Sequence, residues 1–269
     1  MDEIRIRPVG VVHSSQVDLA SVIPFHGQTA RIEIFPEYAG ALKNIDKHSH
    51  LWILSWFHLA NRELLETSPK SVDPYAPVFG VFGLRTAARP NPIGLSLVKL
   101  EQVQGRNLLV QGIDTVDGSP ILDIKPYFEQ DIIFSPLAPY IRPHKKEMLY
   151  QMFYVEALRH HQEECEGFYL ALRMAMIAEE KLGKLHDPEL LVTVVGSPCI
   201  ADTVQGLTRA RVANPPRFKF IESAEESYVL WDNYTRQVKT ALKIKNVTKD
   251  DISNLSVEDL FDITDTELK

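Results

Sequence analysis

The sequence predicts an N-terminal all-β, barrel-like domain followed by a smaller α+β domain. Short apolar segments interrupted by proline and glycine fill roughly the first 145 of the 269 residues, and several short strands at this spacing favour a closed or nearly closed barrel. Beyond them the apolar residues recur with the period of helices, which indicates a change of fold class. We therefore expect a barrel domain at residues 1–147, an α+β domain at 148–245 and an acidic tail at 246–269.

The expected strands of the first domain alternate apolar and polar residues or run apolar. Residues 29–35 alternate, with Ala30 and Ile32 opposed to Arg31 and Glu33. Residues 51–56 form a continuous apolar run, which is typical of a strand buried on both faces. Turn signals separate these segments from the other expected strands, at residues 5–12, 78–84, 95–103, 107–113 and 122–126.

In the second domain we expect helices over residues 164–182, 199–207 and 225–242, with strands at 190–195 and 217–221. The final segment, 246–269, contains seven acidic residues and two lysines. Two outcomes are open for it. It is a solvated tail, or it docks through an amphipathic turn that contains Leu255, Val257, Leu260 and Phe261.

Composition restricts the class of protein. A hydrophobic fraction of 45% with 24% charged residues is that of a soluble globular protein, no apolar run is long enough for a membrane span, and no secretory signal is visible. Two cysteines form no disulfide framework, so we expect a cytoplasmic protein without a membrane partner. The chain has 15 basic against 16 acidic residues up to Tyr150, and 14 against 20 after it. Any contact with a nucleic acid is therefore expected in the first half.

Common nucleotide-binding and hydrolase motifs are absent from the sequence. It contains no Gly-x-Gly turn, no Walker-type phosphate loop and no nucleophile elbow. Instead, polar residues stand at the expected ends of strands in the first half: His58, Arg85, Arg89, Asn91, Asp114, Asp117, Asp123 and Lys125. Each also has a structural interpretation, as a cap, a turn former or an ion-pair partner. Their gathering in one domain favours a functional site, because functional groups collect in loops on a rigid scaffold.

Four blocks of the first half carry a family resemblance. They are residues 8–14 (PVGVVHS), 80–85 (GVFGLR), 89–98 (RPNPIGLSLV) and 114–127 (DTVDGSPILDIKPY). In this order they resemble the TsaA-like (TrmO-type) family. The resemblance implies S-adenosylmethionine-dependent methyl transfer to N6 of threonylcarbamoyladenosine at anticodon-loop position 37 of tRNA. It also implies a β-barrel fold and a homodimer with the cofactor near the subunit interface.

The resemblance implies roles for particular residues. The cofactor pocket would contain the Ile23-Pro24-Phe25 loop together with Phe57, His58, Arg85, Leu95, Gln111, Gly112, Ile113 and Asp114. We interpret Arg85 as the partner of the methionine carboxylate and His58 or Asp117 as the general base. The tRNA would be contacted by Arg89, Asn91 and Lys125, with Lys99, Arg142, Lys145 and Lys146 as further candidates for phosphate contacts or as merely solvated charges.

A second resemblance covers the region from His161 to Thr208. It is similar to the E-type domain of formylmethanofuran dehydrogenase, with one histidine and both cysteines kept as His161, Cys165 and Cys199. A second histidine of the family pattern is replaced by Glu163 and a proline by Glu166. The alternatives are a zinc site and two buried cysteines without a ligand. Two other functions remain open: a metal-binding or redox-associated accessory protein with a non-catalytic barrel, and a methyltransferase that acts on a small molecule.

Overall fold

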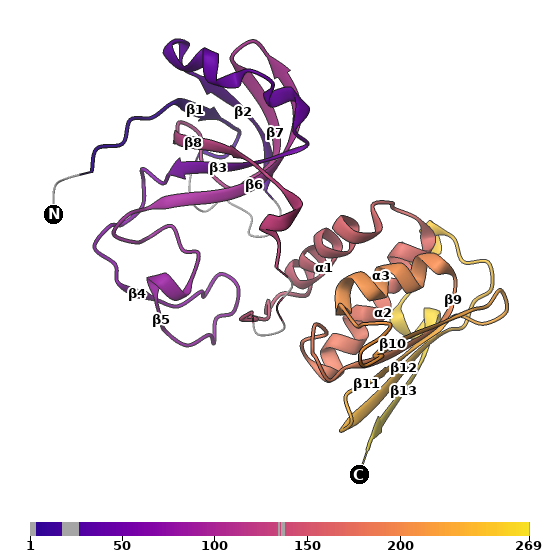
Figure 1. Cartoon of the computed structure of the whole chain (residues 1–269). Coiled ribbons are helices and arrows are strands. Elements are labelled where there is room, and N and C mark those ends of the chain that lie inside the picture. The colour runs from indigo at the N-terminus through magenta and orange to yellow at the C-terminus, as the bar shows by residue number, and fades with distance from the viewer. Residues whose placement is uncertain (1–3, 18–26, 134, 136–137, 269) are drawn as a thin grey trace. The chain divides into compact units, whose positions relative to one another are not determined.

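The computed structural model describes residues 4–17, 27–133, 135 and 138–268. The chain divides into two compact units, Met1–Ile133 and Phe134–Lys269 (Figure 1). Within the described residues, no helix is both long enough and apolar enough to cross a membrane.

The first unit is a closed antiparallel barrel, as the sequence predicts. Its six strands lie in the order β1-β2-β7-β6-β3-β8 (Figure 1). The barrel closes because alternate residues of each strand point inward and bury an apolar core that includes Val12, Ile32, Ile53, Val98 and Val110. The strands are β1 (Gly10–His13), β2 (Gln28–Ile34), β3 (His50–Trp56), β6 (Ile93–Gln104), β7 (Asn107–Ile113) and β8 (Pro120–Pro126).

Strand β3 differs from the expectation that it is buried on both faces. Only its alternate residues Leu51, Ile53 and Ser55 are buried, and the residues between them are half-buried on the outer face. An apolar run thus serves two surfaces: the barrel interior and an outer face of tryptophan and leucine.

The expected strand at 78–84 is wrong. This segment contains the two-residue strand β5 (Phe79–Gly80), which pairs with β4 (Glu66–Thr67), and the short helix η4 (Val81–Gly83). Val81 is buried, whereas Phe82 is exposed. The segment belongs to an excursion between β3 and β6, so its apolar residues have no barrel interior to fill.

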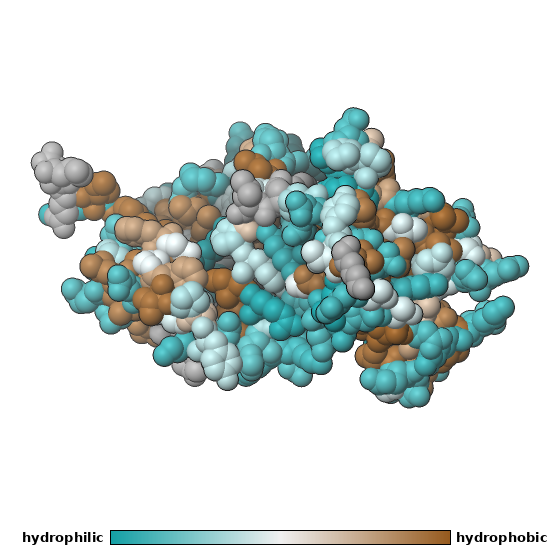
Figure 2. Space-filling model, turned by 90° about the horizontal axis from the view of Figure 1, so that it is seen from below, coloured by the Kyte–Doolittle hydropathy of each residue, from teal (hydrophilic) through white to brown (hydrophobic). Residues whose placement is uncertain are grey.

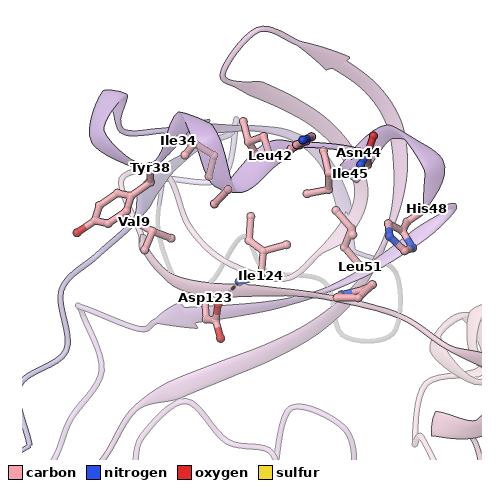
Figure 3. A pocket seen from close by; sticks show the side chains of 13 residues that line it. Val9, Ile34, Tyr38, Leu42, Asn44, Ile45, His48, Leu51, Asp123 and Ile124 are labelled. Atoms are coloured by element: carbon pink, nitrogen blue, oxygen red, sulfur yellow. Dashed lines mark hydrogen bonds between the residues drawn. The ribbon is translucent and has the colours of Figure 1, made fainter.

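One end of the barrel is covered by the 3-10 helices η2 (Pro36–Leu42) and η3 (Ile45–Lys47), which follow β2. A cavity of about 260 Å³ lies there, between these helices and the ends of β2 and β8 (Figure 3). Ile34, Leu42 and Ile124 point into it. This end is lined mainly by apolar side chains, whereas polar side chains gather at the opposite end of the barrel.

The second unit is a five-stranded mixed sheet with helices on one face. Helices α2 and α3 contact β12 and β9, and α1 packs on α2 and α3 (Figure 1). The sheet order is β10-β9-β11-β12-β13. The strands are β9 (Leu191–Gly196), β10 (Phe218–Glu222), β11 (Tyr228–Asp232), β12 (Arg236–Leu242) and β13 (Phe261–Glu267). The helices are α1 (Lys146–His161), α2 (Glu166–Leu182), α3 (Pro198–Thr208), α4 (Lys249–Asn254) and α5 (Val257–Leu260).

The expected helix over 225–242 is wrong, because this segment is the hairpin of β11 and β12. Val229, Trp231 and Val238 point into the core at alternate positions. The turn between the strands is built on Asn233, whose side-chain oxygen accepts hydrogen bonds from the backbone of Thr235 and Arg236. The alternation and the turn chemistry outweigh the helix propensity of the flanking residues.

The segment expected as an acidic tail, 246–269, contributes structured elements to this unit. Strand β13 pairs with β12 along its whole length, and Ile252, Leu260 and Phe261 are buried. Three apolar side chains are enough to dock a segment whose other residues are mostly charged or polar, since each burial contributes on the order of 2 kcal/mol.

Candidate functional site

The strand register gathers polar residues at the barrel end opposite η2 and η3. Strand β3 ends there, followed by Phe57 and His58, and β7 ends there, followed by Asp114. His58 Nδ1 lies 3.5 Å from the Ser119 hydroxyl, at the start of β8. The hydroxyl of Ser96 donates a hydrogen bond to the Asp114 carboxylate. The structure thus brings His58 and Asp114 to one end of the barrel, as expected.

Three buried side-chain oxygens at this end have no hydrogen-bond partner within the described part of the chain: Gln16 Oε1, Ser55 Oγ and Thr115 Oγ1. Hydrogen bonds hold their segments here, since Thr115 O accepts from the Gln28 side chain, at the start of β2, and Gln16 O accepts from the Asp117 backbone. A buried polar atom without a partner costs about 1–3 kcal/mol. Three of them at one end of a barrel therefore point to a polar ligand that completes their hydrogen bonds.

Sequence reasoning missed these oxygens, although a signal exists. Along β3 the inward positions are Leu51, Ile53 and Ser55, so the inward row changes from apolar to hydroxyl at this end. On β6, Ser96 likewise takes an inward position between Gly94 and Val98. A hydroxyl at the last inward positions of two paired strands is a readable mark of a polar barrel mouth.

The Phe57 ring is held over Gly94. A Cβ at position 94 would lie 2.5 Å from both Phe57 Cζ and Ser55 Oγ, so glycine is what allows the ring to lie there. Leu95 points outward and is 46% exposed. Gly112 has a φ of +101°, a left-handed conformation that favours glycine, and its backbone is packed against Gly27.

The residues of the long loop before β6 have different surroundings. Arg85 and Asn91 are exposed. Arg89 instead turns back on its own loop, donating to the carbonyl oxygens of Thr86 at 2.8 Å and Val81 at 3.0 Å, and also to Leu84. The Arg89 guanidinium therefore braces the loop that presents Arg85.

Other predicted residues are not brought to this end. Lys125 pairs with Asp123 at 2.7 Å, four residues along β8 from Ile121 and therefore about 13 Å away from the mouth. Asp117 accepts a hydrogen bond from the Ser14 backbone at 2.9 Å and forms a turn. Arg142 is bonded to Glu179 in the second unit. The Ile23-Pro24-Phe25 loop lies outside the described residues.

A second cluster lies in the second unit, where His161, Cys165 and Cys199 meet. One ligand atom of each lies within 4.8 Å of the others, and His161 Nε2 is 3.4 Å from Cys165 Sγ. The three residues come from the last residue of α1, the N-cap of α2 and the first turn of α3. Gly167 permits this meeting, because a Cβ there would lie 2.7 Å from Cys199 Cβ.

The electrostatics separate the two thiols. Burial raises the pKa of Cys165, but hydrogen bonds from His161, the Phe168 backbone and Cys199 outweigh it and leave the pKa below its ordinary value. Burial and the neighbouring Cys165 raise the pKa of Cys199 to about 11. Burial lowers the pKa of His161, yet the hydrogen bonds to Asp202 and Cys165 leave it above its ordinary value. The cluster thus favours a thiolate at Cys165 next to a charged imidazole.

The donor set fits a zinc ion. Two cysteine sulfurs and one imidazole nitrogen are ligands that zinc takes in proteins, and thiolates disfavour magnesium and calcium. Glu163 and Glu166 stand where the sequence departs from the family pattern, and within the described residues neither carboxylate joins this set of three. Three protein ligands leave the fourth position of a tetrahedral ion open.

Two family models match the chain. The model described as "tRNA-methyltransferase O N-terminal domain" matches residues 20–131, and the one described as "FmdE, Molybdenum formylmethanofuran dehydrogenase operon" matches residues 160–260. The first match falls on the barrel unit, and the second contains all three residues of the cysteine cluster.

Known proteins resemble the chain to different extents. A probable S-adenosyl-L-methionine-binding protein of Methanothermobacter thermautotrophicus is 45% identical over 130 residues, which are 47% of this chain and 92% of that protein. A protein of the same description from Archaeoglobus fulgidus is 34% identical over 223 residues, 78% of this chain and 60% of its own length. The tRNA (adenine(37)-N6)-methyltransferase of Mus musculus is 39% identical over 97 residues, 36% of this chain and 22% of its own. The crystal structure of TrmO from Pseudomonas aeruginosa is 22% identical with a TM-score of 0.39, covering 90% of this chain and 92% of that one.

Proposed function

Because the chain belongs, through its barrel unit, to the family of the tRNA-methyltransferase O N-terminal domain, we propose that it is an S-adenosylmethionine-dependent tRNA adenine N6-methyltransferase. The observation that carries this proposal is the 45% identity to an S-adenosylmethionine-binding protein of which the chain covers 92%. The finer proposal is that the target is N6 of threonylcarbamoyladenosine at position 37 of the anticodon loop. The name of the mouse relative, which specifies adenine 37, supports it.

The polar barrel end is the proposed cofactor and substrate site. Bound S-adenosylmethionine would supply an activated methyl group. Arg85, exposed on the loop braced by Arg89, would bind its carboxylate as a bidentate partner, and Phe57 with Leu95 would contact its adenine. The unpartnered oxygens of Ser55 and Thr115 would accept or donate the hydrogen bonds that a polar ligand offers.

Proton removal from N6 needs a base at this end. His58 is exposed, and the Ser119 hydroxyl 3.5 Å from its Nδ1 holds the ring at the mouth. Asp117, the other candidate, accepts a backbone hydrogen bond in a turn and has a structural task already. We therefore assign the base to His58. The target base lies in a single-stranded loop, so it can leave its stack without the opening of a duplex.

The test measures cofactor binding and the tRNA product separately. Isothermal titration with S-adenosylmethionine should show binding by the wild type and a loss of at least about tenfold in Arg85→Ala, since one bidentate charged pair is removed. Mass spectrometry of tRNA nucleosides from cells without the protein should show loss of the methylated threonylcarbamoyladenosine. Absence of cofactor binding contradicts methyl transfer. Binding with an unchanged nucleoside profile contradicts the tRNA and favours a small-molecule substrate.

We propose a homodimer formed through the outer face of β3 and β6. On these paired strands Trp52 stands opposite Leu97, Leu54 opposite Leu95 and Trp56 opposite Ile93, so apolar side chains form a continuous outer row. Brown, hydrophobic groups of this kind reach the surface among hydrophilic ones in Figure 2, and Leu95 and Ile93 are 46% and 37% exposed. A contiguous exposed apolar patch supports an interface.

Sedimentation velocity should therefore give a dimer for the wild type and a monomer for Leu95→Asp, because a buried unpaired carboxylate opposes association. The matched control is Leu109→Asp, on β7 and also 38% exposed but outside the paired row of β3 and β6. A wild-type monomer, or a dimer that survives Leu95→Asp, contradicts this interface.

We also propose that the second unit binds one zinc ion through His161, Cys165 and Cys199. The observation in support is their convergence, with one ligand atom of each within 4.8 Å of the others. Elemental analysis of the purified chain measures the metal content directly. If zinc is bound while S-adenosylmethionine is not, a metal-binding accessory protein with a non-catalytic barrel replaces the methyltransferase.

A further inference from the structure

One carboxylate links two adjacent histidines beside the cysteine cluster. Asp202 Oδ2 lies 2.7 Å from His161 Nδ1, and its Oδ1 lies 3.3 Å from His160 Nε2. Asp202 and Cys199 are three residues apart on α3, so they lie on the same face of that helix. The same face therefore brings a sulfur to the cluster and a carboxylate to the far side of the imidazole.

We propose that Asp202 is the positioning residue of this site, because it fixes the tautomer and the ring orientation in which His161 offers Nε2 to a metal ion. This role rests on the proposed zinc site. With the Nδ1 proton donated to Asp202, the lone pair remains on Nε2, which lies 3.4 Å from Cys165 Sγ. A carboxylate that accepts from the second nitrogen of a metal-binding histidine also makes that ligand more basic.

The surroundings leave the His161 ring little freedom. Its side chain is only 8% exposed, and the ring stacks on Phe168 with an interplanar angle of 11° and a centroid distance of 6.0 Å. The close approach of α1 and α3 delivers Asp202 to the ring. Gly206 permits that approach, because a Cβ there would lie 2.7 Å from His160 Cβ.

His160 has a different place in this arrangement. Its Nε2 faces Asp202, and its Nδ1 lies 3.4 Å from Arg209 Nη1. Both ring nitrogens are therefore occupied away from the sulfurs, so His160 supports Asp202 and is not a metal ligand. Asp202 is thus held from one side by His160 while it orients His161 on the other.

The experiment measures zinc affinity by competition with a chromophoric chelator, in reductant so that the two thiols stay free. Asp202→Ala should weaken zinc binding by about 10–100-fold, which is the usual effect of removing such a partner. Asp202→Asn should fall between this variant and the wild type, because its amide oxygen still accepts the Nδ1 proton. The control is Asp250→Ala, an exposed aspartate on α4 of the same unit, which should bind zinc like the wild type.

A second readout reports the tautomer itself. Long-range proton–nitrogen NMR of the metal-free chain, at a pH at which the ring is neutral, should show His161 with a hydrogen on Nδ1 in the wild type and in Asp202→Asn. A mixture of tautomers is expected in Asp202→Ala. A merely structural role of Asp202 would not move this signal in folded protein, and thermal unfolding monitors the fold of each variant.

The outcomes separate the two proposals. If the wild type binds no zinc, the metal site and the positioning role both fail. If it binds zinc, and Asp202→Ala binds it equally well or His161 carries its hydrogen on Nε2, only the positioning role is overturned. Weakened binding with the expected tautomer supports both.

Discussion

Replacing Arg142 by methionine should lower the free energy of unfolding of the second unit by about 3 kcal/mol, because it leaves a buried carboxylate without its cation. Glu179 lies on α2 with a completely buried side chain. Arg142 Nε and Nη2 donate to its two oxygens at 2.7 and 2.8 Å, and the Tyr140 hydroxyl donates at 2.8 Å. Burial and the hydrogen bond to Glu179 raise the pKa of Tyr140, so the phenol remains a donor. In the variant, this one neutral donor would face the full charge.

The value is at the low end of the range for broken buried pairs because the Arg142 side chain is itself 45% exposed. Urea unfolding, with hydrogen exchange of α2 peptides to localise the loss, measures the effect. The control is Lys146→Met, whose partner Glu180 is the next residue along α2. That pair is exposed, its atoms are 3.5 Å apart, and its loss should cost at most about 1 kcal/mol.

A double variant makes the interpretation specific. Arg142→Met with Glu179→Met removes both charges, so part of the lost stability should return. Equal losses in Arg142→Met and Lys146→Met, or no recovery in the double variant, would show that the Arg142–Glu179 pair does not hold the segment before α1 onto α2.

Replacing both cysteines by serine should remove the zinc ion altogether. The wild type is expected to contain one zinc per chain, and Cys165→Ser with Cys199→Ser should contain none, because a serine hydroxyl does not ionise to replace a thiolate. The chain has no other cysteine that could substitute. Elemental analysis after removal of loosely bound metal measures the difference.

Metal removal should also lower the thermal stability of the second unit. At a free zinc concentration about one thousand times the dissociation constant, binding to the folded state alone contributes about 4 kcal/mol. A chelator should therefore lower the unfolding temperature of the wild type but leave the double serine variant unchanged. His186→Asn, elsewhere in the same unit, serves as a control that should keep its metal. Zinc retained by the double variant would exclude these sulfurs as ligands.

The barrel could be predicted because its strands carry their pattern locally. Residues 29–35 alternate strictly, and in the structure Ala30, Ile32 and Ile34 are the buried set of β2. The hairpin of β11 and β12 could not be separated from a helix in this way. Its apolar residues include Val229, Trp231 and Val238, whose spacing over the whole segment is compatible with either period, and pairing with β9 decides between them.

The sites divide in the same manner. The resemblance to known families led to His161, Cys165 and Cys199, and the structure brings them together. Asp202 was missed, because an aspartate on a helix carries no local sign that its partner lies 41 residues earlier in the chain. Side chains that act across elements become visible only when packing has fixed which helix faces meet.

The acidic strand β13 also bears on the solubility of the protein. It forms an edge of the second sheet, and its outer backbone groups are a template on which another chain could otherwise add a strand. Asp262, Asp265 and Glu267 line this short strand, so a second copy that approached in register would meet like charges. The segment that completes the sheet thereby also opposes its growth into an aggregate.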